Sequence, residues 1–424
     1  MKNLKRRFFI KSSSLVAGGL VLPSFNINRM ANSANNKKLK VSVVGCGGRG
    51  TGAAVQALRA DENVELVAMA DAFKDRLEKS LNAIKQEFEG EKKIEVKEKN
   101  MLVGFNGYKK AIDLADVVIL ATPPGFRPLH FKYAIDQDKH VFMEKPVATD
   151  AHGVRQVLET AKVANQKKLN VVVGLQRRYQ YSYLNILKQV RRGVIGKITS
   201  GQVRWNGAGV WVRERQPNQT EMEYQMRNWY YFNWLCGDHI VEQHIHNIDV
   251  ANWFINEFPV SAQGMGGREV RKGKDHGEIF DHHFVEFKYA SGATICRHQP
   301  GTHRQVNELL VGTKGKVNIT NKGVIDIEDH DGNIIHTYDG RKDESPYQIE
   351  HNRLFKSIRD GGHLNDTEYG AKSTMSAILG RMATYSGKLV TWDEAMNAND
   401  NMIPENTSWD SNPPVMPDKI GMQI

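Results

Sequence analysis

Short apolar runs alternate with longer amphipathic segments along the first part of the chain, from residue 38 to about residue 175. The runs are rich in β-branched residues, as are strands that are buried on both faces of a parallel sheet. This alternation predicts a doubly wound parallel sheet with right-handed crossover helices. The predicted strands are 39–44, 64–70, 116–120, 140–143 and 170–175, and the predicted helices include 51–60, 75–89, 128–136 and 150–165.

The pattern changes after about residue 179. Apolar runs now follow one another closely, and Ser291-Gly292 and Lys314-Gly315 are turn signals between two pairs of them. Strands joined by so few residues must be antiparallel. We therefore expect a second, α+β domain with a largely antiparallel sheet. Its predicted strands are 196–205, 284–289, 293–297, 308–312 and 316–320, and its predicted helices are 347–359 and 371–385.

A glycine-rich loop follows the first predicted strand. In a Gly-x-Gly-x-x-Gly pattern the first glycine permits a tight turn, the second lets the backbone approach a pyrophosphate, and the third lets the next helix pack closely. The N–H groups at the start of that helix would face the phosphates. An ordinary glycine turn is the alternative. The residues expected to contact a dinucleotide are Gly45, Cys46, Gly47, Gly48, Arg49 and Gly50.

Asp71 ends the second predicted strand and lies about 20 residues after the loop, where the acid that binds the adenosine ribose is expected. Its charge would repel a 2′-phosphate, so NAD is the expected cofactor. NADP stays possible because Lys74 and Arg76 are close in sequence. The alternative is a surface aspartate without a ligand. Strand, loop, helix and acid together favour an N-terminal Rossmann domain in an α/β chain.

Two later strands of this sheet end in residues that would also reach the cofactor. Thr122 and Pro123 follow one strand, and Glu144 and Lys145 follow the next. Ligands of open α/β sheets bind at the carboxyl ends of the strands. All four residues are therefore expected to line the cofactor cleft.

The N-terminal residues 1–35 have the character of a targeting segment. Arg6 and Arg7 precede Phe9, and a mildly apolar stretch, 14–22, follows. This arrangement resembles a twin-arginine signal and predicts export to the periplasm by the twin-arginine machinery, with a disordered basic N-terminus as the alternative. The apolar stretch is too short to cross a bilayer, so no integral membrane segment is expected.

Composition adds little to this picture. The chain has 424 residues, of which 40% are hydrophobic and 25% charged, as in ordinary globular proteins. The net charge of +10 is scattered along the chain, and no nucleic-acid-binding motif accompanies it. Of the three cysteines, Cys46 lies in the glycine loop, so no disulfide framework is expected.

One predicted helix face carries residues suited to catalysis. It holds Glu242, His246, Asp249 and Trp253, which are four, three and four residues apart. A histidine suits removal of a hydroxyl proton, and the ammonium of Lys145 would stabilise a developing alkoxide. Glu242 or Asp249 is expected to fix the tautomer of the histidine. A structural histidine on a polar helix face is the alternative.

Several potential metal ligands lie near this face, namely His239, Glu242, His244 and His246. His244 and His246 point to different faces of the predicted helix. A common ion is therefore not expected, and no metal site is predicted.

Together these motifs resemble the Gfo/Idh/MocA family, named after glucose–fructose oxidoreductase, inositol dehydrogenase and a rhizopine-catabolism protein. The resemblance rests on the glycine loop, the acid after the second strand, Glu144-Lys145-Pro146 and the antiparallel second domain, and it covers residues 38 to about 392. It implies a nicotinamide-dependent oxidoreductase of sugars or polyols, in which Lys145 contacts substrate and cofactor. It also implies a homo-oligomer formed through the open face of the antiparallel sheet.

The family's Asp-x-x-x-His-x-x-Asp motif matches residues 242–249. The match gives His246 the place of the catalytic histidine and Asp249 that of the last acid. Glu242 stands where aspartate is usual, and His244 stands where a small residue is usual.

Further substrate contacts are expected near the junction of the domains. Arg178 and Tyr179 leave the last strand of the first domain, and His244 lies beside the catalytic histidine. Trp211 belongs to a long polar and aromatic insertion, 207–231, and is the candidate for stacking on a sugar. Simple packing on the sheet is the alternative for this tryptophan.

Three functions fit these features. The first is transfer of a hydride from a carbinol carbon of a sugar, sugar derivative or polyol to tightly held NAD. The second is a redox-neutral glycosidase or lyase, in which bound NAD is reduced and reoxidised within one turnover. The third, a non-catalytic sugar-binding protein, is disfavoured by the presence of Lys145 and His246. The expected organisation is a signal and linker (1–35), an NAD-binding domain (38–178), a substrate and oligomerisation domain (179–392) and a surface tail (393–424).

Overall fold

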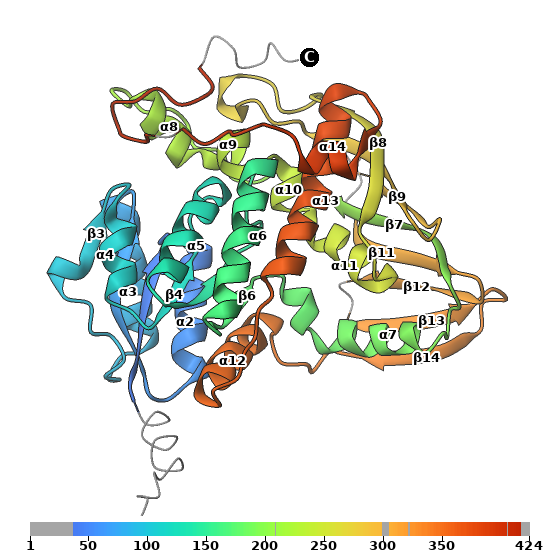
Figure 1. The fold of residues 1–424 in the computed structure, drawn as a ribbon, viewed down its shortest axis with the longest axis horizontal. Coiled ribbons are helices and arrows are strands. Elements are labelled where there is room, and N and C mark those ends of the chain that lie inside the picture. The colour runs from blue at the N-terminus through green and yellow to red at the C-terminus, as the bar shows by residue number, and fades with distance from the viewer. Residues whose placement is uncertain (1–36, 208, 299–304, 321–322, 405, 417–424) are drawn as a thin grey trace, which may run out of the picture. The chain divides into compact units, whose positions relative to one another are not determined.

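The computed structural model describes residues 37–207, 209–298, 305–320, 323–404 and 406–416. The twin-arginine prediction rests on Arg6 and Arg7, which lie outside these residues. Two β-sheets and the helices packed on them make up the described part of the chain (Figure 1). None of its helices combines the length and the apolar character needed to cross a bilayer.

The first sheet has six parallel strands with helices between them, so the Rossmann fold predicted for this part of the chain is confirmed (Figure 1). The strands are β1 (Leu39–Val44), β2 (Val64–Asp71), β3 (Met101–Val103), β4 (Val117–Leu120), β5 (His140–Met143) and β6 (Val171–Val173), in the spatial order β3-β2-β1-β4-β5-β6. The connecting helices are α2 (Gly48–Ala60), α3 (Lys74–Glu87), α4 (Gly107–Asp113), α5 (Arg127–Asp136) and α6 (Ala151–Gln166).

Two details of this sheet differ from the sequence-based expectation. β3 has no counterpart among the predicted strands, because three residues, two partly buried and one exposed, give no periodic signal. α2 begins at Gly48 rather than at residue 51. The last part of the glycine loop is therefore the first turn of the helix.

The second sheet has nine strands and is largely antiparallel, as predicted. Only β7 and β10 pair in parallel among its described neighbours. The strands are β7 (Ile198–Asn206), β8 (Pro259–Gly267), β9 (His282–Tyr289), β10 (Thr294–His298), β11 (Gln305–Gly312), β12 (Gly315–Thr320), β13 (Val324–Asp329), β14 (Ile334–Asp339) and β15 (Val390–Thr391). Their spatial order is β14-β13-β12-β11-β7-β10-β9-β8-β15.

Two later helices return the chain to the first sheet. α12 (Pro346–Arg359) packs against α2, and Ile349, Leu354 and Phe355 join the apolar core on that side of the first sheet (Figure 1). α13 (Thr367–Ser386) packs between α6 and β8, so it contacts both domains. The core of the Rossmann domain thus includes residues from beyond the predicted boundary at 178.

The C-terminal tail follows α14 (Trp392–Met396) and runs back over the first domain. The backbone N–H of Met402 donates to Asp150 Oδ2 at 2.7 Å. Farther along, the ring of Trp409 lies 5.1 Å from that of Phe73 and 4.5 Å from that of Phe105, centroid to centroid. These two phenylalanines belong to the loops that follow β2 and β3, so the described tail covers the carboxyl edge of the parallel sheet.

Candidate active site

The glycine loop is shaped by two close approaches of the backbone. Gly45 has a φ of +99°, and a Cβ there would lie 2.4 Å from the backbone nitrogen of Thr122. A Cβ at Gly50 would lie 1.9 Å from the carbonyl oxygen of Gly45. At Gly47 and Gly48 a Cβ would meet nothing within 4 Å, and both residues line a cavity. The start of α2 therefore has open space beside its N–H groups, as a pyrophosphate site requires.

Asp71 is tied to this loop by its own hydrogen bonds. Its Oδ2 accepts from the backbone N–H of Cys46 at 2.7 Å, and its Oδ1 accepts from the N–H of Phe73 at 2.9 Å. Burial raises the pKa of this carboxyl group. The side chain of Cys46 is buried against the protein, so this residue contributes backbone rather than a thiol to the loop.

A cavity of about 480 Å³ lies at the carboxyl ends of β1, β2 and β4, a size typical of cofactor pockets. Its lining also includes Phe73, Arg76 and Phe105 from the first domain. Of the predicted cofactor-binding residues, those that line it are Gly45, Gly47, Gly48, Arg49, Asp71, Thr122 and Pro123, whereas Cys46, Gly50, Glu144 and Lys145 are not among its lining residues.

The second domain supplies one wall of the same cavity, through Trp211, Arg213, Met226 and Trp229. These residues belong to the predicted insertion, which contains α8 (Glu221–Arg227) rather than being a structureless loop. Trp211 is 38% exposed. The structure therefore places Trp211 beside the dinucleotide cavity, and its stacking on a sugar stays a prediction.

Arg49 links the glycine loop to two carboxylates. It pairs with Glu144, directly before Lys145, and its Nη2 lies 3.4 Å from Oε1 of Glu350 on α12. Burial, together with the charge of Glu144, raises the pKa of Glu350 well above its usual range. Glu144 thus holds the loop of Lys145 against the glycine loop.

The continuous helix predicted from the 242–249 spacing is interrupted. α10 (His239–Glu242) ends before α11 (Ile245–Ile255) begins. The N–H of His244 bonds to the carbonyl of His239, five residues back, and the N–H of His246 bonds to that of Gln243. This widened turn, of a kind often found at functional sites, leaves the carbonyl of Glu242 without its usual partner four residues on.

Lys145 uses the carbonyl that the widened turn releases. Its Nζ donates to the backbone oxygen of Glu242 at 2.6 Å and lies 3.2 Å from the Oε1 of the same residue. Both side chains are largely buried. The ammonium group is therefore fixed by one residue, in a position set by the interruption of the helix.

His246 lies next to this lysine in a buried site. Its ring is stacked on that of Trp205 at a centroid distance of 5.7 Å, and its Nδ1 is buried with no hydrogen-bond partner among the described residues. Burial, and then the positive charges of Lys145 and Arg177, hold the pKa of His246 well below its ordinary value. The imidazole is therefore neutral and able to accept a proton.

Asp249 does not orient His246, and the expectation that one of the two acids would fix its tautomer is wrong. Both oxygens of Asp249 accept from Arg178, at 2.8–3.1 Å, and Ser373 donates to Oδ1 at 2.6 Å. Glu242 pairs with Lys145 instead. The widened turn separates Glu242 from the helix of His246. Asp249 shares that helix but is bonded to Arg178 and Ser373, so sequence spacing does not translate into contact.

The remaining predicted substrate residues are engaged with the protein. Arg178 is held by Asp249 and lies 3.8 Å from the ring centroid of Tyr369. The hydroxyl of Tyr179 donates to Asp366, and this side chain is buried in the core. His244 is buried in the widened turn. None of the three lines the dinucleotide cavity.

A second buried network surrounds Arg177, and its contacts were not predicted from the sequence. Arg177 pairs with Glu308 on β11, which also accepts from Asn247 and, at 2.9 Å, from Tyr183. Arg177 contributes to the low pKa of His246. The sequence signal for Arg177 was its position next to Arg178, just after the last strand of the first domain.

We expect Asp71→Asn to lower the preference for NAD over NADP at least about tenfold. The amide still accepts from the N–H of Cys46, whereas the charge that would repel a 2′-phosphate is gone. Titration of cofactor-stripped protein with both nucleotides measures the effect. Asp75→Asn, an exposed acid on α3, is the matched control. Tighter NADP binding by the unaltered protein would contradict this role of Asp71.

Comparison with known proteins finds many similar chains, among them the following three. Inositol 2-dehydrogenase of Rhizobium meliloti (strain 1021) is 26% identical over 276 residues, 64% of this chain and 73% of that protein. Glycosyl hydrolase family 109 protein 1 of Shewanella sp. (strain ANA-3) is 26% identical over 250 residues, 54% of this chain and only 50% of that protein. The solved structure of aldose-aldose oxidoreductase from Caulobacter crescentus, in complex with glycerol, shares the fold, with 18% identity, a TM-score of 0.66 and coverage of 84% of this chain and 100% of that one.

Family profiles match both domains. Residues 39–174 match the profile described as "Oxidoreductase family, NAD-binding Rossmann fold", and residues 183–318 match the "GFO/IDH/MocA C-terminal domain". Together the two profiles cover well over half of the chain. Because profiles of one family account for both domains in order, the chain belongs to the Gfo/Idh/MocA family of NAD-binding oxidoreductases.

Proposed function

We propose that the protein oxidises a carbinol carbon of a sugar, sugar derivative or polyol, with tightly held NAD as the hydride acceptor. The observation that carries this proposal is the pairing of a fixed ammonium, Lys145, with a neutral, buried imidazole, His246, whose Nδ1 has no partner among the described residues. The two groups are close enough for the charge of Lys145 to lower the pKa of His246.

Each of these side chains has a distinct role in the proposed reaction. His246 accepts the proton of the substrate hydroxyl, since its low pKa keeps it neutral. Lys145 stabilises the negative charge that develops on the same oxygen. The glycine loop, Asp71 and Thr122 would hold NAD, which supplies the hydride acceptor. The bond of Lys145 to the carbonyl of Glu242 keeps the ammonium in place.

A further buried polar group supports a hydroxyl-rich substrate. The hydroxyl of Tyr230 has no hydrogen-bond partner among the described residues. Tyr230 lies near Glu242, whose charge adds to burial in raising the tyrosine pKa. Because an unsatisfied buried polar group is costly, a hydroxyl of a sugar or polyol would relieve it.

A redox-neutral glycosidase or lyase is the second candidate function. Its support is the similarity to the Shewanella family 109 glycosyl hydrolase protein. In that reaction, the same two side chains would act on a sugar that is oxidised only transiently. The oxidised sugar would lose the glycosidic group by elimination, water would add in its place in the glycosidase, and the hydride would then return to the substrate.

Product analysis distinguishes the two candidates. Natively purified, dialysed protein is incubated with free sugars and with aryl glycosides, with and without an artificial electron acceptor. A keto-sugar formed in proportion to reduced NAD or acceptor supports the dehydrogenase. Aglycone release without acceptor and without net reduction supports the glycosidase. Protein that contains NAD but transforms no sugar or polyol would rule out both.

The cofactor is expected to be held tightly, because segments far apart in sequence close its cavity. Trp211 and Trp229 form one wall, and Trp409 packs on Phe73 and Phe105, which form another. Slow release of NAD would require displacement of this aromatic cover. An enzyme with a captive cofactor must restore it in place, by a second substrate or by return of the hydride.

We expect Trp409→Ala to release NAD about 2- to 10-fold faster than the unaltered protein, since an aromatic pair contributes about 0.5–1.5 kcal/mol. The measurement is the NAD retained during dialysis, released by denaturation. Trp392→Ala is the control, because Trp392 packs on Phe258, away from the cavity-lining residues. A wild-type protein that emerges from dialysis empty would contradict a captive cofactor.

A further inference from the structure

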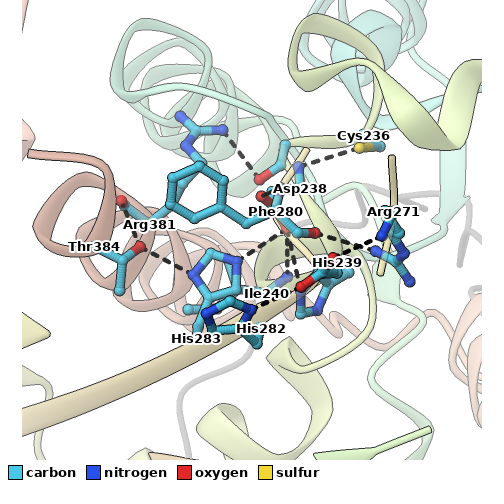
Figure 2. Close-up of polar contacts among 12 residues, drawn as sticks. Cys236, Asp238, His239, Ile240, Arg271, Phe280, His282, His283, Arg381 and Thr384 are labelled. Atoms are coloured by element: carbon cyan, nitrogen blue, oxygen red, sulfur yellow. Dashed lines mark hydrogen bonds and ion pairs between the residues drawn. The ribbon is translucent and has the colours of Figure 1, made fainter. Parts of the chain in front are cut away.

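Three buried side chains outside the proposed catalytic pair converge on one point. They are Asp238 and His239, at the start of α10, and His283 on β9 (Figure 2). One coordinating atom from each lies within 4.8 Å of the other two. His239 is one of the potential ligands weighed in the sequence, from which no metal site was predicted, whereas its neighbour His283 comes from a distant strand.

We propose that Asp238, His239 and His283 bind a divalent transition-metal ion, with zinc the best match. The Nε2 atoms of His283 and His239 lie 3.2 Å and 3.6 Å from the same oxygen, Oδ1 of Asp238. Ligands that are each about 2.0–2.2 Å from a tetrahedral zinc lie about 3.3–3.6 Å apart. Two imidazoles and one carboxylate suit zinc, and leave one position for a non-protein ligand.

The surrounding hydrogen bonds orient the carboxylate for this role. Oδ2 of Asp238 accepts from the N–H of Phe280 at 2.9 Å and from the hydroxyl of Tyr385 at 2.7 Å. These partners fix the carboxylate and direct its other oxygen, Oδ1, to the two imidazoles (Figure 2). Metal-binding carboxylates are typically held in this way.

The environment of His283 is compatible with the tautomer that a ligand requires. Its Nδ1 lies 2.9 Å from Oγ1 of Thr384, and that hydroxyl has the carbonyl of Arg381 within reach at 3.0 Å (Figure 2). When the hydroxyl proton goes to the carbonyl, Nδ1 of His283 is the donor to Oγ1. In that neutral ring Nε2 carries a lone pair, which faces Oδ1 of Asp238 at 3.2 Å.

A lone pair that faces a carboxylate oxygen at 3.2 Å requires a cation or a proton between them. A proton on His283 would bridge one imidazole to Oδ1, whereas the ring of His239 also directs its Nε2 at that oxygen, from 3.6 Å away. One divalent ion would serve all three atoms. The backbone at Asp238 is strained, because its φ of +74° is costly for a residue with a Cβ. Strain of this kind is often found at functional sites.

The ion would have a structural role in the proposed site rather than a part in the reaction. α10 begins at the cluster with His239 and ends at Glu242, whose carbonyl holds Lys145. Fixing the first turn of this short helix fixes the residue that orients the ammonium. This consequence rests on the proposed function, whereas the metal site itself does not.

Metal analysis of the untagged, natively purified full chain tests the proposal. We expect about one zinc per chain after dialysis against a chelator, because the ligands are buried. Refolding with Co²⁺ is expected to give the visible absorption of a tetrahedral site. His283→Gln should lose the metal. His282→Gln should keep it, because His282 is partly exposed and pairs with Asp281.

Two results would overturn the proposal. One is wild-type protein, from zinc-supplemented cells, that contains no stoichiometric metal and gives no cobalt spectrum. The other is an equal metal content in wild type and a folded His283→Gln variant. The metal content and cobalt spectrum of the wild-type protein test the metal site even if the variant does not fold. They do not depend on whether the protein oxidises a sugar.

Discussion

The variant His246→Ala is expected to lose about 10²–10⁴-fold in kcat, since that is the usual contribution of a general base. Bound NAD should be retained, because His246 is not among the residues that line the dinucleotide cavity. Turnover and cofactor content of the purified variant are the measurements. His152→Ala, an exposed histidine on α6, is the control. Near wild-type turnover of His246→Ala would place the base elsewhere.

The pH dependence of the unaltered enzyme gives an independent check on the same residue. Burial and the charges of Lys145 and Arg177 hold the pKa of His246 well below its ordinary value of 6.5. A lowered pKa keeps the base neutral through mildly acidic pH, so kcat/KM should stay level well below pH 6.5 and fall only near the lowered pKa. A fall of kcat/KM on the acid side that is centred near the ordinary pKa of histidine would contradict the role of buried His246 as the base.

Lys145→Met is expected to lower kcat about 10²–10³-fold, the usual effect of losing one group that stabilises a developing oxyanion. Methionine keeps much of the apolar stem of lysine but lacks the charge. The loss should appear in kcat rather than in NAD content, since Lys145 is not among the cavity-lining residues. Steady-state rates and the bound nucleotide are the measurements.

Lys132→Met on α5 is the control for Lys145→Met, because Lys132 is exposed and pairs with Asp136 one turn away. Thermal unfolding of both variants separates lost catalysis from lost stability, since the carboxylate of Glu242 loses its ionic partner in Lys145→Met. Unchanged turnover of a folded Lys145→Met protein would remove the lysine from the proposed mechanism.

The first sheet could be predicted because its signals are local. Runs such as 39–44 and 140–143 are apolar throughout, and the glycine loop marks the turn between strand and helix. β8 lacked such a signal, since Gly264, Gly266 and Gly267 interrupt it and glycine weakens a strand. Its place in the sheet is set by pairing with β9.

The candidate site could be predicted as a set of residues but not as a set of contacts. The sequence identified Glu242 and His246 by their spacing and Lys145 by its place after a strand, whereas the widened turn at Gln243 and His244 decides how they meet. The partner of Arg49 shows the same limit, because Glu350 lies 301 residues away in sequence. Contacts of this kind depend on how helices that are distant in sequence pack on the same sheet, and local sequence patterns do not predict that packing.

The return of α12 to the first sheet bears on the order in which the chain is built. Protein synthesis proceeds from the N-terminus, and N-terminal domains generally fold first, as units. Here Ile349, Leu354 and Phe355 complete the core of the N-terminal sheet. A nascent chain that has emerged only to the end of β6 therefore exposes an apolar surface that α12 later covers, and the Rossmann domain reaches its full core only after most of the second domain has been synthesised.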